Sequence, residues 1–168
     1  MTALHFRQLS LKYGFLLLIG LIIEWWIVWY SPLNLPEKIP STPIRVDGIL
    51  LIILFLIVFI KAEKDYLKAN SEATILELTI LGTVICLLAE IIFQLIRQPF
   101  LNAVAFSEHL YYYTIGVLVV TVFCAFLSFL VAFQLKTKQT FKLVLIIIGF
   151  VVLINGIKHF FPGLFGPY

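Results

Sequence analysis

The chain has 168 residues, of which 62% are hydrophobic and 12% charged, with a formal net charge of +3 and a mean hydropathy of +1.08. A water-soluble domain of this size cannot bury so much apolar surface, because more than half of a small globule's surface is already apolar. The composition excludes a soluble globular protein and predicts an all-α, polytopic transmembrane helical bundle. The length favours a single integral membrane domain, residues 1–168.

Five apolar segments follow one another along the chain, and each is a candidate membrane span. They are residues 13–30, 46–62, 73–97, 110–134 and 142–160. Arg7 and Lys12 precede the first segment, as in a signal peptide, but Glu24-Trp25-Trp26 stands where a small-residue cleavage site is expected. We therefore interpret the first segment as a retained helix.

The second segment is the shortest of the five. Its uninterrupted core, Ile49–Ile60, is twelve residues of Ile, Leu, Val and Phe, or about 18 Å of helix. We expect five spans, with four as the alternative if this segment does not cross. The charged residues 61–72 are expected to continue its helix as far as a turn at Asn70-Ser71, with Ser71 as the N-cap of the next helix.

Lysine and arginine residues orient the bundle. With five spans and the N-terminus inside, eight of them lie on the inner side and four on the outer side, as the positive-inside rule requires. Four spans with the N-terminus outside give the same division, and both arrangements place the C-terminus outside. Since these cations flank apolar segments, the net positive charge does not indicate a nucleic-acid partner. The Ile-, Lys- and Phe-rich composition is typical of AT-rich bacterial genomes, so we expect a multi-pass protein of a bacterial inner membrane.

The third segment carries a polar stripe at spacings that keep its members on one helical face. The members are Thr79, Thr83, Cys86, Glu90, Gln94 and Arg97. The fourth segment has a matching stripe of small or polar residues: Thr114, Thr121, Ala125, Ser128 and Ala132. We expect these two helices to pack along the stripes, because small residues allow close approach of helix backbones in a membrane. The second segment has no small residue in its core and is expected to face lipid or a partner chain. Cys86 and Cys124 are expected to be small buried side chains.

Several polar residues lie at a matched depth in the outer third of the bilayer if all five segments cross. Glu24, Glu90 and Asn155 each lie about 7 to 11 Å below the outer surface. A carboxylate in mid-membrane costs about 3 kcal/mol or more, so such groups need partners or neutralisation. The candidates for binding a ligand or protons are Glu24, Glu90, Gln94, Arg97, Asn155 and His159.

Three interpretations of this cluster are open. It is a satisfied polar network that sets helix register, or an outward-facing pocket that binds or transports a small ligand or protons, or a catalytic site of Glu90 with His109 or His159. The sequence has no nucleophile motif, metal-ligand spacing or cofactor fingerprint, so we expect no catalytic residues, no metal and no cofactor. The functional alternative is a non-catalytic accessory or assembly subunit of a membrane complex, or a homo-oligomer.

Overall fold

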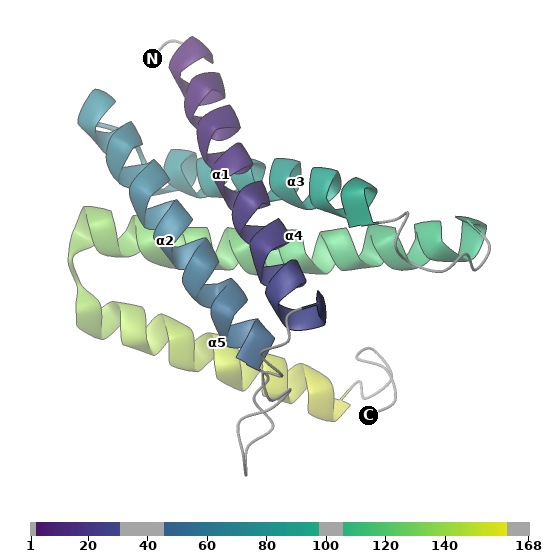
Figure 1. Cartoon of the computed structure of the whole chain (residues 1–168). Helices are drawn as coiled ribbons and strands as arrows, with labels where there is room; N and C mark the ends of the chain where they lie inside the picture. Colours follow the sequence, from purple (N-terminus) through teal and green to yellow (C-terminus); the bar gives the residue numbers. More distant parts are fainter. Residues whose placement is uncertain (1–2, 31–45, 98–105, 161–168) are drawn as a thin grey trace. The chain divides into compact units, whose positions relative to one another are not determined.

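The computed structural model describes residues 3–30, 46–97 and 106–160, and the side chains of residues 4–27, 48–97, 114 and 116–153. Within these residues the chain forms five helices (Figure 1), so the predicted all-α class is confirmed. The helices are α1 (Ala3–Tyr30), α2 (Val46–Ala69), α3 (Ile75–Arg97), α4 (Phe106–Thr137) and α5 (Thr140–Phe160). Each predicted segment corresponds to one helix, except that residues 73–74 of the third segment precede α3, and α2 continues through the charged residues to Ala69, as expected.

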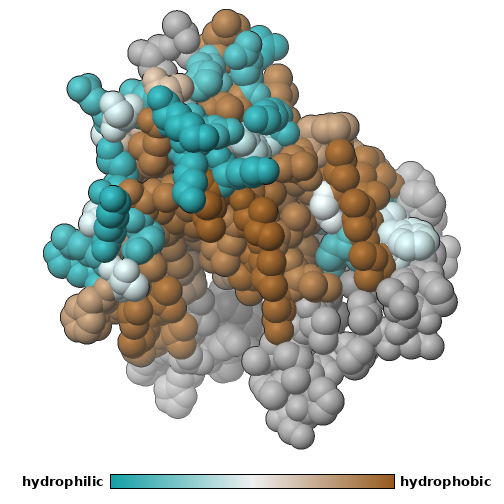
Figure 2. Space-filling view, turned by 60° about the vertical axis from the view of Figure 1, so that its left-hand side comes forward, coloured by the Kyte–Doolittle hydropathy of each residue, from teal (hydrophilic) through white to brown (hydrophobic). Residues whose placement is uncertain are grey.

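Three helical segments among the described residues are long and apolar enough to cross a membrane. They are Leu4–Ile27, Ile75–Arg97 and Gly116–Thr137. A shorter apolar segment, Thr140–Leu153, lies in α5. Hydrophobic side chains cover much of the surface in Figure 2, and hydrophilic ones gather at the end where α1 begins and α2 ends. These features indicate a multi-pass membrane protein whose helices contact the lipid bilayer.

The chain divides into two compact units, Met1–Ala132 and Phe133–Tyr168. The first contains α1, α2, α3 and most of α4, and its described core is built from large apolar side chains. The fully buried ones include Leu17, Val58, Phe59, Tyr66, Leu78, Leu81 and Ile85.

Helices α1 and α3 run alongside each other in the same direction. A Cβ atom built on Gly14 of α1 would lie 3.7 Å from the Leu88 Cβ of α3. Further along both helices, the Trp25 and Phe93 rings meet edge to face with centroids 6.1 Å apart. Since higher numbers on α1 meet higher numbers on α3, the two helices are parallel.

Helix α2 runs antiparallel to α1 and packs one face into the first unit, which the sequence did not predict, while Ile53 and Ile57 on its other face are exposed, as expected for a helix that faces lipid or a partner chain. Tyr13 of α1 contacts Asp65 of α2, whereas Gly20 of α1 lies against Leu54. Phe55, Phe59 and Tyr66 are buried. Helix α2 can lie close to α1 because Gly20 has no side chain that would clash with Leu54.

The start of α3 differs from the prediction. Thr74, not Ser71, is the N-cap: the Glu77 backbone N–H donates to Thr74 Oγ1 at 3.2 Å, and the Thr74 backbone N–H donates to Glu77 Oε2 at 2.7 Å. This reciprocal pair is a capping box, which satisfies two backbone donors at once. The Glu that stands three residues after Thr74 has no counterpart after Ser71.

In the second unit, α4 and α5 are joined by a tight turn. Lys138 adopts a left-handed backbone conformation with φ of 54°, and its N–H donates to the Gln134 carbonyl at 3.0 Å. The Gln134 side-chain amide also donates to Thr140 Oγ1 at 3.1 Å. These contacts end α4 and begin α5.

Candidate functional site

Glu90 lies inside the first unit, where its residue is only 5% exposed. The Gln94 side-chain amide, one helical turn further along α3, donates to Glu90 Oε1 at 2.6 Å. The polar face predicted for this helix therefore brings Glu90 and Gln94 together. Burial and a short hydrogen bond hold the Glu90 carboxyl in a defined position.

Arg97 does not neutralise Glu90 by direct contact. Among the described residues no ion pair joins the two side chains, and Arg97 Nε has no hydrogen-bond partner there. Gln94 stands between them on the helix and bonds to Glu90. The described hydrogen bond to the carboxyl thus comes from a neutral amide.

For the other predicted members of the cluster, the structure describes the side chain of Glu24 but not those of Asn155 and His159. Glu24 is partly exposed on α1, and the contact of its neighbour Trp25 with Phe93 puts it at the same end of the α1–α3 pair as Glu90. Asn155 and His159 belong to α5, and their side chains lie outside the described residues.

Helices α3 and α4 are in close contact, as the two stripes predicted, although Gly82 rather than a threonine stands at the crossing. A Cβ atom on Gly82 would overlap the Ser128 side chain. One turn away, the Cys86 and Cys124 thiols share a hydrogen bond, and both residues are fully buried, as expected. The Thr79 and Thr83 hydroxyls instead donate to carbonyls of their own helix, at 2.9 and 2.7 Å.

A second buried carboxyl belongs to Glu63 of α2, which the sequence analysis did not include among the candidate site residues. Glu63 is fully buried, and its Oε1 lies 2.8 Å from the Ser128 hydroxyl of α4. Phe55, Phe59 and Glu63 repeat every four residues, so one face of α2 buries all three. This continued spacing is the signal that identifies Glu63.

Charged groups outside the apolar segments form a separate cluster where α1 begins and α2 ends. The Tyr13 hydroxyl donates to Asp65 Oδ2 at 2.5 Å, and Lys68 Nζ donates to Asp65 Oδ1 at 3.1 Å. Lys12 Nζ lies 3.7 Å from Asp65 Oδ2. The Tyr13 hydrogen bond and the nearby Lys68 lower the pKa of Asp65 to about 2. This cluster ties α1 to α2.

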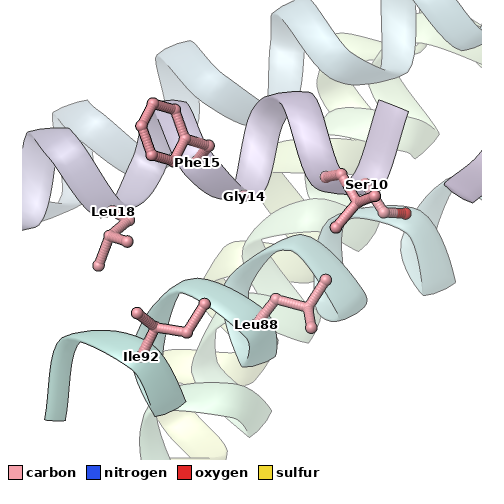
Figure 3. A pocket seen from close by; sticks show the side chains of 7 residues that line it. Ser10, Gly14, Phe15, Leu18, Leu88 and Ile92 are labelled. Atoms are coloured by element: carbon pink, nitrogen blue, oxygen red, sulfur yellow. The ribbon is translucent and has the colours of Figure 1, made fainter. Parts of the chain in front are cut away.

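An apolar pocket of about 310 Å³ lies between α1 and α3 (Figure 3). Gly14, Phe15 and Leu18 line it from α1, and Leu88 and Ile92 line it from α3. Phe15 is 65% exposed, so the pocket opens at the surface. Its lining suits hydrocarbon and does not include Glu90 or Glu63.

Comparison with protein-family models, with curated proteins and with solved structures finds no match for this chain.

Proposed function

We propose that this protein is a single-domain, five-span membrane protein of the cell membrane that binds and relays protons through Glu90. The observation that carries the proposal is the burial of Glu90 together with its hydrogen bond from the neutral Gln94 amide. A carboxylate without a bonded cation is costly in a membrane interior, and protonation removes that cost. Glu90 is thereby suited to take up a proton and to release it when a polar group or water approaches.

The proposed surroundings of Glu90 follow the predicted cluster. Gln94 orients the carboxyl, and Arg97, one turn beyond Gln94, stabilises the ionised form at longer range. Glu24 lies at the same end of the α1–α3 pair, and Asn155 and His159 of α5 keep the role of proton-binding candidates that the sequence gives them.

The parallel direction of α1 and α3 supports the five-span topology. If α2 did not cross, the next span would run back through the membrane and α3 would be antiparallel to α1. The contacts Gly14–Leu88 and Trp25–Phe93 show instead that α1 and α3 run in the same direction. The start of α1 and the end of α2 then share the basic side, which the positive-inside rule assigns to the cytoplasm.

Proton flux in reconstituted vesicles tests the proposal. With an imposed pH gradient and an entrapped pH-sensitive dye, the wild-type protein is expected to dissipate the gradient and Glu90→Gln to be at least tenfold slower. Glu72→Gln is the matched control, because Glu72 is exposed in the turn before α3. Equal flux through wild type and Glu90→Gln would contradict the proposal.

The alternative function is that of an accessory or assembly subunit, docked on a partner membrane protein or on a second copy of this chain. The exposed apolar face of α2 favours it, because Ile53 and Ile57 are 47% and 57% exposed although the opposite face is buried. Copurification separates the two functions. A partner at fixed stoichiometry favours the assembly function, and an active protein without one favours proton binding.

A further inference from the structure

The buried carboxyl of Glu63 has two acceptor oxygens but only one hydroxyl donor beside it among the described residues, that of Ser128. Ser128 Oγ lies 2.8 Å from Glu63 Oε1, 3.3 Å from the Leu78 carbonyl oxygen and 3.4 Å from the Thr79 carbonyl oxygen. A serine hydroxyl carries one hydrogen and can donate it once. Glu63 Oε2 is buried and has no hydrogen-bond partner among the described residues.

One additional proton on Glu63 satisfies this arrangement. A protonated Glu63 donates from Oε1 to Ser128 Oγ, and the Ser128 hydroxyl then donates to the Leu78 or Thr79 carbonyl. Glu63 Oε2 becomes the carbonyl oxygen of a neutral acid, which is much less costly to leave without a donor than a carboxylate oxygen. Without the proton, the Ser128 hydrogen can serve Glu63 Oε1, but Glu63 Oε2 is then a buried carboxylate oxygen with no donor among the described residues.

The charged groups on the neighbouring elements do not replace that proton. Lys12 of α1 and Lys68 of α2 both contact Asp65. On α3, the carboxyl group nearest in sequence to Leu78 and Thr79 is that of Glu77, which forms the capping box with Thr74. From α4 the group that faces Glu63 is the Ser128 hydroxyl. Among the described residues, Glu63 makes no ion pair.

We propose that Glu63 is a second proton-binding site, formed by its carboxyl group and the Ser128 hydroxyl at the point where Gly82 lets α3 and α4 approach closely. The Leu78 carbonyl marks its level on α3, about 18 Å along the helix axis from Glu90. The hydrogen-bonded thiols of Cys86 and Cys124 lie between the two levels. If the function proposed for Glu90 holds, on which this connection rests, the two carboxyls are the inner and outer stations of one proton path.

Infrared difference spectroscopy of the full-length protein in lipid nanodiscs tests this site without relying on flux. A stretching band of a protonated carboxyl group that persists in Glu90→Gln is expected at neutral pH, and this band is expected to be lost in Glu63→Gln. Ser128→Ala is expected to keep the band and shift it to higher frequency, because the acid loses its acceptor. If Glu63→Gln does not fold, the Ser128→Ala shift alone decides the assignment, and a band unmoved by it overturns the proposal.

Three results would overturn the inference. They are a Glu63→Gln spectrum identical to wild type, a Ser128→Ala spectrum with the band at the wild-type frequency, or loss of the band when sodium ions are added at constant pH. The last would make the oxygen cluster a metal-cation site. Glu90→Gln is expected to leave the Glu63 band in place, so absence of proton flux with this band intact contradicts the proposed function alone.

Discussion

At the scale of single residues, Gly82 controls how closely α3 approaches α4. A Cβ atom there would lie 2.6 Å from the Ser128 Cβ, which a rotation of the Ser128 side chain cannot relieve. Gly82→Ala is therefore expected to lower the free energy of unfolding by about 1–3 kcal/mol, the usual cost of overpacking. Thermal unfolding in detergent measures the change.

Gly116 provides the matched control for this prediction, because no atom of the described residues lies within 4 Å of a Cβ atom built on it. Gly116→Ala is expected to leave stability unchanged or to raise it by up to about 1 kcal/mol, since alanine favours a helix over glycine. Equal effects of the two substitutions would show that Gly82 does not stand at a close crossing.

Asp65 gives a pH dependence whose sign follows from its lowered pKa. The Tyr13 hydroxyl and Lys68 bind the ionised carboxylate and hold its pKa at about 2 in the folded state, against an ordinary value of 3.8. The stabilisation is complete above the ordinary value and is lost as the pH falls toward about 2. The melting temperature of wild type is expected to exceed that of Asp65→Asn above pH 4, with a difference that shrinks on acidification.

Tyr13→Phe is the companion variant, because the hydrogen bond from Tyr13 is the largest cause of the lowered pKa. Its loss of stability with acid is expected to be smaller than that of wild type. A difference between wild type and Asp65→Asn that grows as the pH falls would contradict this account of the cluster.

At the scale of helices, residue spacing along one helix predicted some contacts well and others poorly. The stripe on α3 predicted its contact with α4, because residues three and four apart share a face. The burial of α2 was missed, since its space is created by Gly20 of α1 and Gly82 of α3, which no pattern within α2 reveals. Glu63 was missed because it stands between Lys61 and Lys64 in a charged segment, whereas the four-residue repeat from Phe55 places it on the buried face of α2.

The arrangement of the helices leads to a prediction about the two ends of the chain. A tag ahead of α1 is expected to be shielded in intact cells, and a tag after α5 to be accessible, as protease or antibody access would show. An accessible tag ahead of α1 would contradict the five-span topology and favour four spans. A shielded tag after α5 would contradict both arrangements.

At the scale of the whole molecule, the proposed function requires buried carboxyl groups that are neutralised by protons and not by neighbouring cations. A structural role would require the opposite, an ionised Glu90 that balances Arg97 and fixes the bundle for assembly. The hydrogen bond from Gln94 and the absence of an ion pair to Arg97 among the described residues favour proton binding. The sequence predicted that Glu90 and Gln94 share a helical face but not this distinction, because spacing along α3 allows either contact.

The free energy of unfolding of Glu90→Gln, compared with wild type in the same detergent at neutral pH, tests this claim most directly. Glutamine has the shape of a protonated glutamate and can hydrogen-bond to Gln94, so the account predicts a change of less than about 1 kcal/mol. If Glu90 were instead the partner of Arg97, the substitution would leave a partly buried cation unpaired. A loss of about 3–5 kcal/mol would then be measured, and that result would contradict the account.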